Sequence, residues 1–210
     1  MTEQEVLEML NRVGAVITNS HIVYTSGKHG PDYVNKDAIY PSTTNTSLLG
    51  QEIAERFYND EVEVVIAPAI GGVILSQWTA YHLSDGLFGR EVLSIYAEKS
   101  ESGGFIIKRG YDKLVAGKRV LVVEDVLTTG GSAKAVVEAV RTIGGKVVGL
   151  GALVNRGGVT AQEIGGVSKF IALVNIKLAA WQEADCPLCE QGVPINLDVG
   201  KGREFLARKK

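Results

Sequence analysis

The chain has 210 residues, which is the size of one domain with embellishments, since domains commonly span about 100–200 residues. Hydrophobic residues make up 45% and charged residues 22% of the sequence, and this globular composition excludes a collagen-like or wholly disordered chain. The chain has 22 basic and 24 acidic residues, which give a net charge of -2. This charge balance argues against a nucleic-acid partner.

Cysteine content and hydropathy predict the compartment. Cys186 and Cys189 are the two cysteines of the chain, too few for a disulfide framework and suited to a reducing cytoplasm. The first residues lack the basic-then-apolar layout of a signal peptide, and no apolar stretch approaches the roughly 20 residues that span a bilayer. We therefore expect a cytoplasmic protein without a membrane partner.

Helices and strands follow from local patterns in chain order. Thr2 and Glu5 form a capping-box pattern that predicts a helix ending at Gly14. Residues 15–44 are irregular, and a second helix is predicted over 45–58. Strands are then expected at 62–67, 92–97, 119–123, 146–154 and 170–174, with helices at 73–83 and 132–143. Apolar strands that alternate with helices predict a parallel sheet covered on both faces, followed by a polar tail over 176–210.

One loop carries recognisable chemistry. The apolar strand 120–123 is followed by Glu124 and Asp125, and then by Thr128, Thr129, two glycines and Ser132 before a helix. Ligands bind open α/β sheets at this position, beyond the carboxyl ends of the strands. Glycines, hydroxyls and helix-start N–H groups suit a phosphate, whereas carboxylates suit sugar hydroxyls or hydrated Mg²⁺. The loop therefore predicts a site for a phosphorylated sugar.

This loop resembles the phosphoribosyl pyrophosphate (PRPP) signature of type I phosphoribosyltransferases. Segments 26–33, 67–72 and 154–156 make the resemblance closest to the orotate phosphoribosyltransferases. The resemblance implies an α/β fold with a five-stranded parallel sheet flanked by helices and a small N-terminal hood. A single phosphoribosyltransferase domain over 1–210 would then divide into a helix and hood (1–44), an α/β core (45–175) and a C-terminal tail (176–210).

The implied reaction transfers the 5-phosphoribosyl group from PRPP to orotate and gives orotidine 5′-monophosphate and pyrophosphate, a step of pyrimidine (UMP) biosynthesis. The resemblance also implies Mg²⁺ as cofactor and a homodimer. Lys99 and Asp125 are the expected catalytic residues. The residues expected to bind PRPP are Ala69, Gly71, Lys99, Glu124, Asp125, Val126, Leu127, Thr128, Thr129, Gly130, Gly131 and Ser132.

Orotate recognition is expected from Arg156, Thr128, Lys28 and Tyr33. The fork of a guanidinium group matches a carboxylate with two hydrogen bonds, which makes Arg156 the expected reader of the orotate carboxylate. In the family a cationic loop neutralises the leaving pyrophosphate. The corresponding stretch 97–104 keeps only Lys99, so Lys108 and Arg109 are alternative sources of this charge.

Two other functions fit the same loop. A purine-type phosphoribosyltransferase would share it and bind another base, and a catalytically silent regulator would sense PRPP without turnover.

Cys186 and Cys189 form one Cys-x-x-Cys pair, whereas zinc prefers four ligands, which a dimer of two such pairs would supply. His21, His29 and His82 show no metal-ligand spacing, so no metal-ligating residue is assigned. His29 is a candidate for the base pocket, and the other two histidines are expected to be structural.

Overall fold

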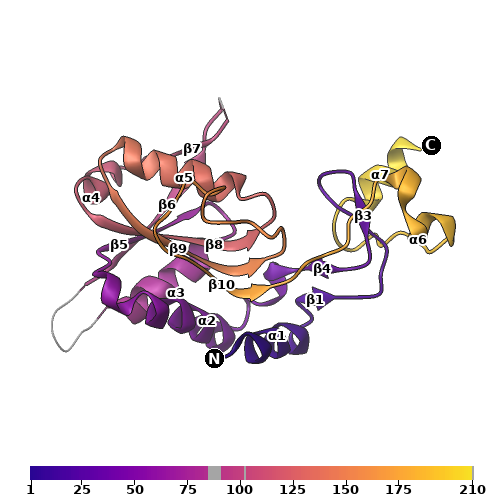
Figure 1. Ribbon diagram of the computed structural model, residues 1–210, viewed down its shortest axis with the longest axis horizontal. Coiled ribbons are helices and arrows are strands. Elements are labelled where there is room, and N and C mark those ends of the chain that lie inside the picture. Colours follow the sequence, from indigo (N-terminus) through magenta and orange to yellow (C-terminus); the bar gives the residue numbers. More distant parts are fainter. Residues whose placement is uncertain (85–90, 102, 210) are drawn as a thin grey trace. The chain divides into compact units, whose positions relative to one another are not determined.

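The computed structural model describes residues 1–84, 91–101 and 103–209 of the chain (Figure 1). These residues form two compact units, each built from two stretches of sequence. The larger unit comprises Met1–Val6 and Tyr40–Ile176, and the smaller one comprises Leu7–Ile39 and Lys177–Lys210. The N-terminal segment and the C-terminal tail therefore fold with each other.

A six-stranded sheet is the centre of the larger unit, in the order β10-β9-β8-β5-β6-β7. Its strands are β5 (Val64–Pro68), β6 (Leu93–Lys99), β7 (Phe105–Ile106), β8 (Arg119–Leu127), β9 (Lys146–Asn155) and β10 (Phe170–Asn175). The five strands expected from the sequence all pair in parallel, which confirms the predicted parallel sheet. The sixth strand, β7, is a short antiparallel addition at the edge next to β6.

Helices cover both faces of this sheet (Figure 1). Helices α2 (Thr43–Arg56) and α3 (Val73–Leu83) lie on one face, and α4 (Asp112–Val115) and α5 (Gly131–Thr142) lie on the other. A short 3-10 turn, Tyr58–Asp60, follows α2. Within the described ranges, no helix combines the length and apolar character that crossing a bilayer requires.

Strand β8 is packed into the core of the larger unit. Val120 and Val122 of β8 are fully buried against Val136 and Val140 of α5. Burying a side chain of this size stabilises the fold by about 1.5–3 kcal/mol relative to exposure. The strand that leads to the predicted ligand loop is thus fixed by apolar packing along its length.

Helix α1 (Glu3–Arg12) begins as its sequence predicts. The Thr2 N–H donates a hydrogen bond to Glu5 Oε2 at 2.7 Å, and the Glu5 N–H donates one to Thr2 Oγ1 at 3.3 Å. The hydrogen bonds from the Thr2 backbone and hydroxyl hold the pKa of Glu5 below its ordinary value. The reciprocal capping box is therefore confirmed.

Short elements make up the smaller unit. They are the antiparallel pairs β1 (Val16–Ile17) with β4 (Tyr33–Val34) and β2 (Ile22–Val23) with β3 (His29–Gly30), the 3-10 turns Lys36–Ala38 and Glu183–Asp185, and helices α6 (Pro187–Glu190) and α7 (Gly202–Arg208). The backbones of His29 and Trp181 exchange two hydrogen bonds of 2.8 Å. The tail is consequently tied to the β2–β3 hairpin rather than loosely attached.

Candidate functional site

Strand β8 extends further than its apolar pattern predicts. It runs to Leu127 and pairs with β9 up to the partners Leu127 and Asn155. Glu124 and Asp125 therefore lie inside the strand, not in the loop after it, and each is 6% exposed. Carboxylates are seldom this buried, and two adjacent ones at the end of a strand mark the end of β8 as a candidate functional site.

Alternation along β8 separates the two acids. Successive side chains of a strand point to opposite faces of the sheet. Glu124 therefore shares its face with Val120 and Val122, which pack in the core beneath α5. Asp125 belongs to the other face, on which α3 lies. The two carboxylates therefore belong to opposite faces of the sheet at the carboxyl end of β8, and both line the same cavity.

A glycine turn connects β8 to α5. Gly130 has φ 72°, a left-handed conformation that favours glycine, and a Cβ there would lie 2.8 Å from Ile164 Cγ2 and 2.9 Å from Val159 Cγ1. Helix α5 starts at the next residue, and its N-cap residue, Gly130, has no side chain with which to cap it. The first N–H groups of a helix lack intrahelical acceptors and carry partial positive charge. This end of α5 is thus suited to an anion.

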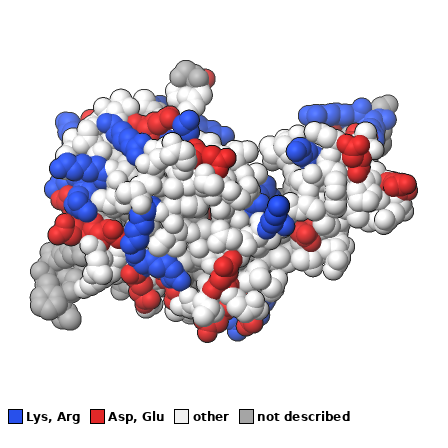
Figure 2. Space-filling model, viewed as in Figure 1, with Lys and Arg blue, Asp and Glu red and all other residues white. Residues whose placement is uncertain are grey.

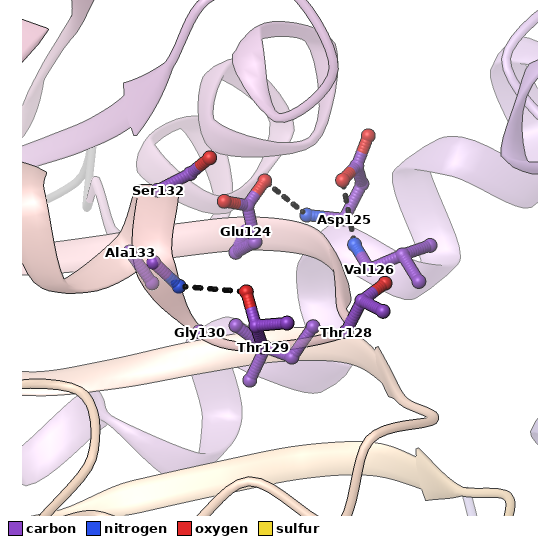
Figure 3. Close-up of a pocket in the computed structure, with 10 residues that line it drawn as sticks. Glu124, Asp125, Val126, Thr128, Thr129, Gly130, Ser132 and Ala133 are labelled. Carbon is purple, nitrogen blue, oxygen red and sulfur yellow. Dashed lines mark hydrogen bonds between the residues drawn. The ribbon is translucent and has the colours of Figure 1, made fainter. Parts of the chain in front are cut away.

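Residues 124–133 enclose a cavity of about 190 Å³, shown in Figure 3. The Asp125 N–H donates to Glu124 Oε1 at 3.2 Å, and the Val126 N–H donates to Asp125 Oδ1 at 2.6 Å. The Gly131 N–H points to Thr129 Oγ1 at 3.4 Å. Acceptors from β8 and donors from the turn and α5 therefore face one space, which fits a ligand with both hydroxyl and phosphate groups.

A second loop, residues 69–72, lies against the same end of β8. The Ala69 N–H donates to the Ala97 carbonyl at 2.8 Å, and the Tyr40 hydroxyl donates to the Gly71 carbonyl at 2.7 Å. A Cβ on Gly72 would lie 3.0 Å from the Val123 carbonyl oxygen. The loop is therefore adjacent to the acidic pair, although Ala69 and Gly71 are not among the residues that line the cavity.

Arg156 stands beside the cavity. Its backbone N–H donates to the Leu127 carbonyl at 3.0 Å, and its Nε–H donates to Thr128 Oγ1 at 2.9 Å. The side chain is half-buried. These two bonds join the end of β9 to the start of the loop and orient the guanidinium plane, so the structure brings Arg156 and Thr128 together, while their assignment to orotate stays a prediction.

Gly157 makes a close backbone contact beside the cavity that the sequence analysis missed. Its N–H donates to the Leu127 carbonyl at 3.2 Å, and a Cβ on it would approach Thr128 O within 1.7 Å. The chain signals this close approach only by the Gly-Gly pair after Arg156. Glycine is therefore required here by contact with the backbone of the cavity wall.

The loop cations occupy different surroundings. Lys99 is exposed at the end of β6, where it pairs with Phe105 of β7 across a tight hairpin, and it does not line the cavity. Arg109 donates from Nε to Glu98 Oε1 at 2.6 Å, and this hydrogen bond raises the pKa of Arg109. Because the charge of Arg109 is paired with Glu98, Lys99 is the better candidate for a cation that meets a ligand.

Two predicted base-binding residues belong to the smaller unit. Lys28 is exposed in the turn between β2 and β3, and Tyr33 is half-buried in β4 opposite Ile17. Their assignment to orotate stays a prediction.

Comparisons with known proteins decide the family. The family model "Phosphoribosyl transferase domain" matches residues 35–186. The chain is 35% identical over 195 residues to the orotate phosphoribosyltransferase of Caldanaerobacter subterraneus subsp. tengcongensis, which covers 93% of this chain and 96% of that protein. The chain belongs to the orotate phosphoribosyltransferase family.

Solved structures agree with this family. The structure of Mycobacterium tuberculosis H37Rv orotate phosphoribosyltransferase is similar with a TM-score of 0.67 at 25% identity, over 83% of this chain and 96% of that one. An adenine phosphoribosyltransferase from Thermoanaerobacter pseudethanolicus has a TM-score of 0.60 at 18% identity, over 83% of this chain and 100% of its own. Since the fold also occurs in an adenine phosphoribosyltransferase, the fold alone does not identify the base that this phosphoribosyltransferase uses.

The contact at Gly157 gives a stability prediction. Gly157→Ala should destabilise the protein by about 1–3 kcal/mol, because the added methyl group overpacks the backbone of Thr128. For a chain of this size, each kcal/mol lowers Tm by about 2–4 °C. Thermal unfolding measures this loss. Gly131→Ala is the matched control, since its Cβ would make only an ordinary 3.5 Å contact with Thr129 Oγ1; equal Tm values for both variants would contradict the proposed wall contact.

Proposed function

We propose that this enzyme transfers the 5-phosphoribosyl group from PRPP to orotate, with orotidine 5′-monophosphate and pyrophosphate as products in pyrimidine biosynthesis. One observation carries the proposal: a single cavity combines a buried acidic pair with the N-terminus of α5, where the N-cap residue Gly130 has no side chain. PRPP requires this combination, because its ribose hydroxyls need acceptors and its 5-phosphate needs donors. The orotate phosphoribosyltransferases to which the chain is similar support the choice of base.

Positioning is the main task of such a site. Glycosyl transfer passes through a transition state with oxocarbenium character, and no protein nucleophile is needed in this scheme. Glu124 and Asp125 would hold the ribose hydroxyls, while residues 128–132 would hold the 5-phosphate through hydroxyls and backbone N–H groups. A ribose fixed at both ends leaves its reactive carbon facing the base, and this preorganisation lowers the barrier.

Mg²⁺ is the cofactor we propose. Glu124 and Asp125 present hard oxygen ligands in the cavity, and each carboxylate is nearly excluded from solvent. Oxygen ligands of this kind fit a partly hydrated Mg²⁺ ion that is shared with a substrate phosphate. When bound, the ion supplies positive charge to the pyrophosphate group.

Arg156 is the proposed reader of the orotate carboxylate. Its Nε–H is oriented by Thr128 at the wall of the cavity, and a guanidinium fork pairs with a planar carboxylate through two parallel hydrogen bonds. Uracil lacks this carboxylate. A site built around the Arg156 fork should therefore discriminate strongly between the two bases.

Lys99 is the proposed cation for the leaving pyrophosphate, and a homodimer is the proposed assembly. Lys99 is exposed on the β6–β7 hairpin and lies outside the lining of its own cavity. A second copy that contributes its hairpin to the site would account for this placement.

We also propose a cytoplasmic location, in keeping with two free cysteines.

The acidic pair provides the first functional test. The double variant Glu124→Gln with Asp125→Asn should lose about 100-fold or more in PRPP-dependent turnover, since each hydrogen bond to a charged group is worth about 1.5–3 kcal/mol. Steady-state assays with orotate, uracil, adenine, hypoxanthine and xanthine measure the effect. Glu138→Gln, on the exposed face of α5, is the control for the substitution itself. Normal turnover by the folded double variant would refute the assignment of the acids, and wild-type use of a purine in place of orotate would refute the named base.

Lys99 is tested by separating kcat from KM. Lys99→Ala should lower kcat about 100-fold while PRPP still binds, because a cation that acts on the departing charge matters chiefly in the transition state. Lys113→Ala, also exposed on the larger unit, is the control. A kcat within twofold of the parent, a difference of about 0.4 kcal/mol, would remove Lys99 from the mechanism. If Lys99 acts across a dimer, mixing this variant with the Glu124/Asp125 double variant restores part of the activity.

Arg156 is tested by base binding. Arg156→Ala should weaken orotate binding far more than PRPP binding, and Arg156→Lys should rescue it only in part, because the ammonium group lacks the bidentate fork. Calorimetric titrations of orotate and of PRPP into the wild type and both variants give the comparison. Unchanged orotate affinity in the Ala variant would show that another group reads the base.

A further inference from the structure

Four potential metal ligands converge in the smaller unit. They are His21, His29, Cys186 and Cys189, and their ligand atoms all lie within 4.8 Å of one another. His21, His29 and Cys186 are buried, and Cys189 is half-buried. The two pairs are far apart in sequence, so the fold alone assembles the cluster. We propose that these four side chains form a structural zinc site of the Cys₂His₂ type.

Distances within the cluster match the edges of a zinc tetrahedron. Zn–N bonds of about 2.0 Å and Zn–S bonds of about 2.3 Å imply ligand separations of roughly 3.3 Å for N to N and 3.5 Å for N to S. His21 Nε2 lies 2.9 Å from His29 Nδ1, and Cys189 Sγ lies 3.3 Å from the same nitrogen. His21 Nε2 lies 3.7 Å from Cys189 Sγ and 3.8 Å from Cys186 Sγ. Small side-chain adjustments therefore suffice for tetrahedral coordination.

The backbone holds both pairs in the required orientation. In the β2–β3 hairpin, Val23 pairs with His29, and alternation along the strand places His21 on the same face as Val23 and His29. Cys186 precedes the single turn of α6 and Cys189 lies within it, so the Cys-x-x-Cys spacing directs both sulfurs to one side. Figure 1 shows α6 and α7 beside this hairpin within the smaller unit.

The tautomer of His21 is already that of a metal ligand. Its Nδ1 lies 2.7 Å from the Val193 carbonyl oxygen. A carbonyl oxygen only accepts, so Nδ1 carries the proton and Nε2 presents its lone pair to the cluster. Metal-bound histidines commonly donate their second ring N–H in this way.

His29 also directs one ring nitrogen, Nδ1, into the cluster. Among the described residues its other nitrogen, Nε2, has no hydrogen-bond partner. Its ring packs in a T-shaped arrangement on Phe205 of α7, with centroids 4.8 Å apart. The ring is thus held by an apolar contact, and Nδ1 is the atom that lies next to His21 Nε2 and Cys189 Sγ.

Charge and packing favour zinc at this place. Two thiolates balance the charge of Zn²⁺, so the buried site is neutral overall, whereas unpaired buried charges are costly. The tail has almost no core of its own, because from Lys177 to Lys209 only Cys186 and Gly202 are buried. Units below about 70–80 residues often need a metal or disulfide for stability. A structural zinc ion would add a side-chain attachment to the backbone hydrogen bonds that already join the tail to the hairpin, independently of the proposed reaction.

Metal content and cobalt spectroscopy test the site on the full chain. The wild type from zinc-supplemented cells should retain about one zinc ion per chain, and Co²⁺ added after chelation should give the visible absorption of tetrahedral sulfur–nitrogen coordination. Cys189→Ser and His21→Ala should weaken zinc binding by at least about 100-fold, since loss of an outer-shell partner alone costs about 10–100-fold. His82→Ala, the remaining histidine of the chain, should bind zinc as the wild type does.

Two further readouts keep the proposal falsifiable if a variant fails to fold. In the wild type, zinc should protect both cysteines from alkylation, and chelation should increase proteolysis and amide exchange in residues 177–209. A wild-type protein that neither retains zinc nor gives a cobalt spectrum would overturn the proposal. So would a mass lower by two hydrogen atoms, which indicates a Cys186–Cys189 disulfide, or equal metal binding by His21→Ala and the wild type.

Discussion

The pairing of β8 with β9 is the constraint on which the site depends. It continues to Leu127 opposite Asn155, and the Leu127 carbonyl then accepts the N–H groups of both Arg156 and Gly157. This pairing fixes where the strand stops, where the loop to α5 starts, and how close the loop lies to the end of β9. A shift by one residue would exchange the faces of Glu124 and Asp125.

The larger unit uses apolar packing to hold an unfavourable polar arrangement. Glu124 and Asp125 are nearly buried at the end of a strand whose preceding residues are fully buried. At the N-terminus of α5 the N-cap residue, Gly130, has no side chain, although a capping side chain would add about 0.5–2 kcal/mol. A phosphate bound at this helix end would supply acceptors to its N–H groups.

The smaller unit holds together two stretches of chain that bury few side chains in the tail. Its two stretches come from opposite ends of the chain, and few of its tail residues are buried. Backbone hydrogen bonds from Trp181, Asn196 and Lys201 attach the tail to the hairpin. The His and Cys side chains meet where these attachments bring the two stretches together.

On the face of the molecule in Figure 2, acidic and basic side chains are interspersed, which agrees with the small net charge.

The sequence by itself determined the parallel sheet, the capping box of α1 and the ligand loop, because each is written in residues close along the chain. Apolar runs specify buried strands, and the Gly-Gly pair after Thr128 and Thr129 specifies the turn that connects β8 to α5. Tertiary structure decided the rest. The contact of Gly157 with Thr128 and the pairing of Arg109 with Glu98 depend on strand register and on a hairpin. His21 and His29 have no metal-ligand spacing, and they meet Cys186 and Cys189 only because the tail returns to the N-terminal hairpin. Periodicity describes neighbours within one element, whereas contacts between distant segments are set by packing that no local pattern records.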